Sequence, residues 1–135
     1  MVFKRILPVL LILILILLFA GCNDLDTTNT DIEYRQISMA DAVIMMETES
    51  DYIILDVRTA EEFAEKRIPG AINVPNENIG SSDIPELPDK DQLILVYCRS
   101  GRRSKLAAEK LCALGYTNVV EFGGINDWRG ETVSG

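Results

Sequence analysis

The stretch LILVYCRSGRRS, residues 93–104, contains an apolar run that leads directly to a cysteine and three arginines. The five residues 93–97 have the length and the side chains of a buried strand. Gly101 lets the chain turn tightly after the cysteine, because glycine adopts backbone angles that other residues avoid. Beyond the turn, apolar residues recur at helical spacing, at Leu106, Ala107, Leu111 and Leu114. Gly115 then stands where a helix cap is expected. The stretch therefore predicts a strand, a tight loop and a helix in succession.

Short apolar runs alternate with amphipathic stretches around this unit, the order of an α/β domain with a mainly parallel sheet. Ser38 fits an N-cap, and Thr59 with Glu62 has the spacing of a capping box. The sequence predicts strands over 33–37, 52–55, 71–74, 93–97 and 118–122. It predicts helices after Ser38, over 60–66 and after Gly101, and a terminal helix that starts over 125–128. A loop with at most one helical turn is expected over 75–90, and a turn at Gly123-Gly124.

The loop after residues 93–97 has the features of an anion-binding site around one cysteine. Backbone N–H groups converge where a strand ends and a helix begins, and the helix dipole adds positive potential there. Arg99, Arg102 and Arg103 add positive charge. These features favour a thiolate, so we expect the pKa of Cys98 to be lowered. The alternative is a buried apolar cysteine beside solvated arginines, which is less favoured because a core cysteine gains nothing from such neighbours.

The composition limits the kinds of reaction and the classes of binding partner that are expected for this chain. A chain of 135 residues has room for one globular domain. It contains no histidine, the commonest general base and metal ligand, and Cys22, Cys98 and Cys112 lack the close spacing of a zinc or dithiol motif. The formal charge of -8 excludes nucleic acid as a partner held by the overall field. Residues 98–135 hold 6 basic and 4 acidic residues, so an anionic substrate is expected there.

A charged and then apolar segment has the pattern of a signal peptide, predicted over residues 1–21. Lys4 and Arg5 precede an apolar run over 9–20. This run is shorter than the roughly 20 residues that a helix needs to span a bilayer. A cleaved signal is therefore favoured over an uncleaved membrane anchor.

The end of this segment resembles a lipobox, at which bacterial lipoproteins are lipidated on a cysteine and cut just before it. Residues 19–22 are Phe-Ala-Gly-Cys, and an aliphatic residue is usual where Phe19 stands. We expect a lipid on Cys22, a polar acidic tether over 22–32 and the domain over 33–135. The domain would then be exported and held to a membrane, facing the periplasm or the cell exterior. A plain secretory signal is the alternative.

Four motifs, taken in order over about residues 37–129, resemble those of single-domain rhodaneses, the thiosulfate sulfurtransferase family. They are Leu-Asp-Val-Arg at 55–58 with Glu62-Phe63, Ile-Pro-Gly-Ala-Ile-Asn-Val-Pro at 68–75, the Cys98 loop, and Gly-Gly-Ile at 123–125 before Trp128. The resemblance implies a five-stranded, mainly parallel sheet with helices on both faces. It also implies that Cys98 is catalytic and becomes a persulfide. The residues expected to bind substrate are Arg99, Ser100, Gly101, Arg102, Arg103 and Ser104.

Three residues outside the loop bear on the same site. Arg58 matches an arginine that lies near the active-site pocket in the family; a structural ion pair with an acid such as Glu62 is the alternative. Arg67 stands where members commonly have histidine, so no role of that histidine is carried over. Cys112 is expected in the core, since about 1.5 Å of helical rise per residue puts it roughly 15 Å from Cys98, too far for a disulfide.

The resemblance implies a sulfurtransferase that uses neither a metal nor an organic cofactor. Sulfane sulfur would pass from a small anionic donor such as thiosulfate, through Cys98, to cyanide or a thiol. One alternative is an exported binding module without turnover. The other is a phosphatase or arsenate reductase of the same fold, whose loop is one residue longer and carries an arginine where this chain has Ser104. The enzyme is favoured over the binding module because the chain keeps both the cysteine and the arginines.

Overall fold

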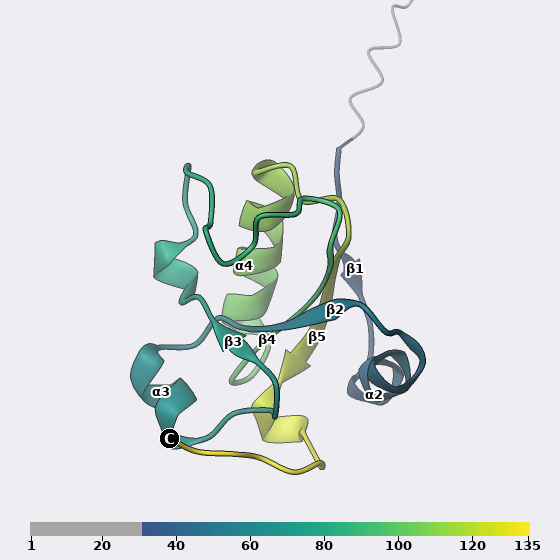
Figure 1. Cartoon of the computed structure of the whole chain (residues 1–135), viewed down its shortest axis with the longest axis vertical. Coiled ribbons are helices and arrows are strands. Elements are labelled where there is room, and N and C mark those ends of the chain that lie inside the picture. Colours follow the sequence, from purple (N-terminus) through teal and green to yellow (C-terminus); the bar gives the residue numbers. More distant parts are fainter. Residues whose placement is uncertain (1–30) are drawn as a thin grey trace, which may run out of the picture. The chain divides into compact units, whose positions relative to one another are not determined.

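Five strands form one sheet in the computed structural model, which describes residues 31–135 (Figure 1). The strands are β1 (Arg35–Gln36), β2 (Tyr52–Asp56), β3 (Ile72–Asn73), β4 (Leu93–Cys98) and β5 (Val119–Gly124), in the order β1-β5-β4-β2-β3. Every neighbouring pair is parallel. The predicted five-stranded, mainly parallel sheet is therefore confirmed, and its strands are parallel throughout.

The predictions for the N-terminal segment concern residues that the structure does not describe. The signal peptide over 1–21, the lipid on Cys22 and nearly all of the tether over 22–32 lie outside the described residues. Within residues 31–135, no helix is both long and apolar enough to cross a membrane.

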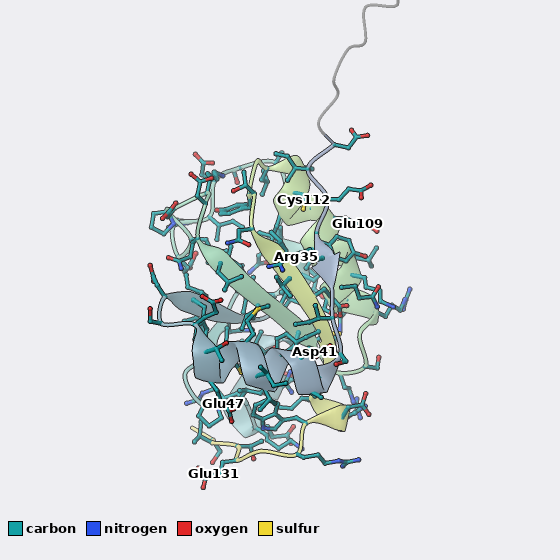
Figure 2. All side chains as sticks on the ribbon, turned by 90° about the vertical axis from the view of Figure 1, so that its right-hand side faces the viewer. Arg35, Asp41, Glu47, Glu109, Cys112 and Glu131 are labelled. Carbon is teal, nitrogen blue, oxygen red and sulfur yellow. The ribbon has the colours of Figure 1, made fainter. Side chains whose placement is uncertain are left out.

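Helices cover both faces of the sheet. They are α2 (Met39–Thr48), α3 (Ala60–Glu65) and α4 (Arg102–Ala113), with single 3-10 turns at η1 (Asn76–Asn78) and η2 (Ile125–Asp127). Figure 1 shows α4 and α2 on opposite sides of the sheet, and Figure 2 places α2 in front of it with Asp41 and Glu47 along the helix. The helices on both faces that the resemblance implied are confirmed.

Local side-chain caps begin two of these helices where the sequence predicts them. The Ser38 hydroxyl accepts a hydrogen bond from the Asp41 amide at 3.1 Å. Thr59 and Glu62 form the capping box, each side chain accepting from the other residue's amide, at 3.2 and 2.9 Å. The caps fix where α2 and α3 begin, because they satisfy amides that have no partner within the helix.

The alternation of side chains along β4 decides which face carries the cysteine. All six residues of β4 are buried. Ile94, Val96 and Cys98 belong to the apolar cluster that packs under α4, whereas the other three strand residues belong to the cluster that packs under α2. Cys98 therefore points toward α4, at the carboxyl end of a strand in the middle of the sheet.

The face that α4 buries differs from the predicted one. Its buried residues are Ser104, Ala107, Ala108, Leu111 and Cys112, which recur at three and four positions. Leu106 is 42% exposed, so its place on the core face was predicted wrongly. Leu106 precedes Ala107 by one residue, which rotates it away from the stripe that faces the sheet. The predicted cap is confirmed: Gly115 has φ +92°, and the Tyr116 amide donates to the Leu111 carbonyl at 3.1 Å.

Two predictions at the end of the chain are corrected. The turn expected at Gly123-Gly124 is instead the end of β5, where Cys98 pairs with Gly124 after a shift in register. Pairing with β4 keeps these glycines in the sheet, although Gly123 has φ +98°. The helix expected to start over 125–128 is only the single turn η2.

Gly124 is the point where the loop after Cys98 rests against β5. A Cβ atom at this position would overlap the Arg99 carbonyl and the Ser100 amide, which are backbone atoms and cannot rotate away. The Arg99 carbonyl in turn accepts a hydrogen bond from the Asn126 amide at 3.2 Å. Gly124 is therefore required by close packing of two backbones.

We predict that Gly124→Ala lowers the free energy of unfolding by about 1–3 kcal/mol, because the loop must move away from β5. Urea unfolding of the variant and of the unchanged chain measures the difference. Gly80→Ala is the matched control, since a Cβ at Gly80 meets no atom within 4 Å. Equal stability of the Gly124→Ala variant and the unchanged chain would show that the loop tolerates displacement.

Candidate active site

The Cys98 sulfur lies at the bottom of a three-residue loop between β4 and α4. Cys98 is 1% exposed, and α4 begins at Arg102. Gly101 has φ +103°, a conformation that favours glycine, and its amide donates a hydrogen bond to the sulfur at 3.0 Å. The loop therefore aims a backbone amide at the sulfur, close to the positive end of the α4 dipole.

Hydrogen bonds set the ionisation of this thiol. Burial raises the pKa of Cys98, but hydrogen bonds with the Ser104 side chain and with the backbone of Ser104, Gly101 and Ser100 outweigh burial, so the pKa lies below its usual value. The lowered pKa expected from the sequence is thus found. Its main favourable causes are hydrogen bonds of the loop rather than the arginine charges.

Ser104 connects the sulfur to a buried acid. Its hydroxyl lies 3.4 Å from the Cys98 sulfur and 2.6 Å from Oε1 of Glu121. Glu121, in β5, is 0% exposed, and its Oε1 also accepts the Gly123 amide at 2.8 Å. Glu121 is not among the residues predicted from the sequence. The signal was present as a single acid inside the apolar run Val-Val-Glu-Phe at residues 119–122.

One of the three arginines of the loop forms an ion pair with an acid, and the other two are exposed. Arg103 forms a two-pronged ion pair with Glu62, at 2.8 and 3.1 Å. Arg99 and Arg102 are exposed at the rim, as is Ser100. The binding of an anion by all three arginines stays a prediction, and the charge of Arg103 is already matched by Glu62.

The ion pair also changes the acidity of Glu62. Hydrogen bonds from Arg103 lower the pKa of Glu62 to about 2, against the opposing effect of burial and with help from Thr59. Glu62 thus joins the first turn of α3 to the first turn of α4. This link ties α3 to the start of α4, directly after the loop.

Arg58 is held by a buried ion pair whose acid is Asp56. Its guanidinium contacts both Asp56 carboxylate oxygens at 2.6–3.1 Å and donates to the Lys66 carbonyl at 2.6 Å. Arg58 is 4% exposed. The sequence-based alternative of a structural ion pair describes this contact, but its suggested partner Glu62 is wrong. Arg58 nevertheless lines a cleft beside the loop, together with Glu62, Glu65, Lys66, Arg99, Ile125 and Asn126.

Cys112 lies near the other end of α4, next to Glu109 in Figure 2. Both Cys112 and Cys98 are free and buried. Burial raises the pKa of Cys112, the opposite direction to that of Cys98. Cys112 is therefore a core residue, as predicted. Within residues 31–135, no cluster of three or more possible metal ligands occurs.

We predict that Glu62→Gln lowers the free energy of unfolding by about 1–2 kcal/mol at neutral pH, because it removes the charge that binds Arg103. The lowered pKa makes this contribution fully present above the unfolded value of about 4.3 and lost as pH falls toward 2. Urea unfolding at neutral pH and at acidic pH measures the loss, and the two chains should converge in acid. Glu109→Gln, at an exposed position, is the control. A deficit that persists unchanged in acid would contradict the ion-pair origin.

Comparisons with known proteins agree on one family. The model of the Rhodanese-like domain matches residues 39–131. The chain is 37% identical over 81 residues to the thiosulfate sulfurtransferase PspE of Escherichia coli, covering 60% of this chain and 78% of that protein. It is 37% identical over 103 residues to the putative sulfurtransferase YtwF of Bacillus subtilis, covering 74% and 95%. A solved rhodanese with anions from E. coli superposes with a TM-score of 0.57 at 36% identity, covering 62% of this chain and 99% of that chain.

Proposed function

Because the chain belongs to the rhodanese-like domain family, we propose that it moves sulfane sulfur from a small anionic donor to a nucleophilic acceptor through a persulfide on Cys98. The observation that carries the proposal is the Gly101 amide directed at the Cys98 sulfur at 3.0 Å. A thiol held in this way, with a pKa below its usual value, gives up its proton more readily and is therefore a better nucleophile. Named sulfurtransferases among the relatives support sulfur transfer as the general reaction.

The first half of the reaction loads the sulfur. The Cys98 sulfur attacks the outer sulfur of thiosulfate, the bond between the two thiosulfate sulfurs breaks, and sulfite leaves with the bonding electrons. Exposed Arg99 and Arg102 attract the anion to the rim of the loop. Arg103 contributes less to this attraction, because its charge is matched by Glu62.

The second half of the reaction discharges the persulfide. Backbone amides of residues 100 and 101, which already lower the pKa of Cys98, stabilise negative charge at the outer sulfur in the manner of an oxyanion hole. Cyanide or a thiol then attacks that sulfur, and the Cys98 sulfur is released. The cleft lined by Arg58 and Glu62 lies beside the loop and provides a path for the acceptor.

The size of the loop supports sulfur transfer over phosphate chemistry. Only three residues separate Cys98 from the first residue of α4. The position six residues after the cysteine is Ser104, whose hydroxyl faces inward to Glu121. The loop is thus one residue shorter than that of the phosphatases of this fold and lacks their arginine at this place, so its cradle suits a single sulfur atom better than a tetrahedral phosphate.

We also propose that the domain acts outside the cell membrane, held by a lipid on Cys22. Residues 1–21 supply the signal-peptide pattern, and the polar residues after Cys22 supply the tether. Two acyl chains on the cysteine would give stable anchoring, whereas one chain gives only marginal attachment. The negative charge of the chain offers no electrostatic attraction to anionic lipid.

We predict that Cys98→Ser abolishes sulfur loading and that Cys112→Ser keeps it, because only the first change removes the nucleophile. Intact mass after incubation with thiosulfate should show the gain of one sulfur atom in the unchanged chain and in Cys112→Ser, and none in Cys98→Ser. Cyanolysis should fall at least about a hundredfold in Cys98→Ser. A chain that binds thiosulfate but never gains mass would support the binding-module alternative.

We predict that Cys22→Ala blocks lipidation and leaves an unprocessed precursor at the membrane. The native N-terminus, measured by mass spectrometry, should be a lipidated Cys22 in the unchanged chain. Removal of residues 1–22 should release a protein that no longer partitions with membranes. An unmodified Cys22, or a mature chain that keeps residues 1–21, would contradict the lipoprotein proposal.

A further inference from the structure

The buried carboxyl group of Glu121 has no part in the reaction described above. It lies on β5 beneath the catalytic loop and is 0% exposed. Oε1 accepts hydrogen bonds from the Ser104 hydroxyl at 2.6 Å and the Gly123 amide at 2.8 Å. Among the described residues, none forms a hydrogen bond with Oε2. A charge buried in this way is costly, and an unsatisfied oxygen in a native site calls for a functional explanation.

The Ser104 hydroxyl lies between the sulfur and the carboxylate, and the Gly101 and Gly123 carbonyls, at 3.0 and 3.3 Å, are its other acceptors. The Cys98 thiol donates to Ser104 Oγ at 3.4 Å, and Ser104 Oγ donates to Glu121 Oε1. The second distance, 2.6 Å, is within the range of an O–H group bonded to a charged oxygen. The Gly123 amide keeps Oε1 directed at Ser104. A proton can therefore leave the sulfur in two short transfers, without contact with solvent.

We propose that Glu121 is a positioning residue that acts through Ser104: it holds the proton of the Cys98 thiol while the persulfide exists and returns it when the persulfide is discharged. The proposal rests on the sulfur-transfer function and deepens it. It gives this chain, which has no histidine, a proton acceptor for the cysteine. Protonation of Glu121 also removes the cost of its buried negative charge at the stage when the outer sulfur of the persulfide is negatively charged.

The two half-reactions balance with a single proton. During loading, the Cys98 sulfur bonds to the outer sulfur of thiosulfate, sulfite leaves with the electron pair, the thiol proton moves to Ser104 Oγ, and the Ser104 proton moves to Glu121 Oε1. During discharge, cyanide bonds to the outer sulfur and the electron pair of the broken S–S bond returns to Cys98. The Ser104 proton then moves to the Cys98 sulfur, and Glu121 gives its proton back to Ser104. The products are thiocyanate, the thiol and the carboxylate, so the protein takes up no proton over the cycle.

Other ionisable groups near this path come from the elements packed around it. Tyr34, before β1, lies near Glu121, and burial, Glu109 and Glu121 raise its pKa in that order, with Cys112 adding a smaller effect. On the side of the loop, Arg103 of α4 interacts with the Cys98 charge, but Glu62 of α3 holds its guanidinium. The Ser104 hydroxyl, in contrast, contacts both the Cys98 sulfur and the Glu121 carboxylate.

Discharge of preloaded persulfide by cyanide, followed by stopped flow, tests the proposal on the full chain. Glu121→Gln keeps the shape and an acceptor for Ser104 but cannot hold the proton. We expect it to slow discharge by at least about tenfold at neutral pH. Both chains are compared at the same pH, so that the titration of cyanide itself cancels in the ratio of the wild-type rate to the variant rate. The solvent isotope effect should decrease in the variant as well.

Ser104→Ala should slow discharge similarly, and the double variant should be no slower than the slower single one, because both changes break the same path. Glu109→Gln, at an exposed position of α4, is the matched control and should discharge at the wild-type rate. Two results would overturn the proposal. One is wild-type discharge by Glu121→Gln. The other is a slowing that keeps the wild-type solvent isotope effect, which indicates a purely structural role.

A measurement on the unchanged chain covers the case in which Glu121→Gln does not fold. Persulfide formation in a weakly buffered indicator solution, at a pH high enough that the released sulfite takes up no proton, should release no proton, and release of one proton per persulfide would refute the proposal. A wild-type chain that takes no sulfur from thiosulfate would instead refute the proposed function. The persulfide can then be loaded from polysulfide, and the discharge rates still decide the role of Glu121.

Discussion

The close approach of the catalytic loop to the end of β5 is the constraint on which the site depends. Gly124 has no room for a Cβ atom, because the backbone of Arg99 and Ser100 occupies that space. The contact fixes the loop over the sheet, and the left-handed Gly101 then directs its amide at the Cys98 sulfur. The same approach brings the loop over Glu121. The acidity of the thiol, the cradle for the outer sulfur and the Ser104 path therefore all follow from one packing requirement between backbones.

The arginines near the loop have two different roles: some form ion pairs that stabilise the site, and others are free to bind an anion. Two acids, Asp56 and Glu62, each hold one arginine in a two-pronged ion pair, and these pairs join β2 and α3 to the site. Arg99 and Arg102 remain exposed and can meet an incoming anion. A sequence rich in arginine does not by itself give the positive charge of a site, because acids neutralise part of that charge and such an acid can lie far away in the chain. For Arg103, the neutralising acid is 41 residues away.

Features that depend on neighbours along the chain could be predicted from the sequence, whereas contacts between distant segments could not. The caps at Ser38 and Thr59 and the helix end at Gly115 involve residues only a few positions apart, and all three are found. The alternation along β4 likewise follows from its apolar run. The partner of Arg103, the link between Ser104 and Glu121, and the extension of β5 through Gly124 depend on how strands and loops pack across the sheet. Leu106 was misplaced because a single position along a helix changes the face by about 100°.

The two outermost strands of the sheet, β1 and β3, have only two residues each. A long, exposed edge offers unpaired backbone groups to a strand of another molecule, which is a common route to aggregation. Here each edge offers very few such groups, and Asn73 of β3 bonds back to the Asp56 and Arg58 carbonyls. The long strands β4 and β5, whose apolar sequences would pair readily with copies of themselves, lie inside the sheet. Short borders thus protect the folded domain against strand exchange between copies, even when many copies are crowded together.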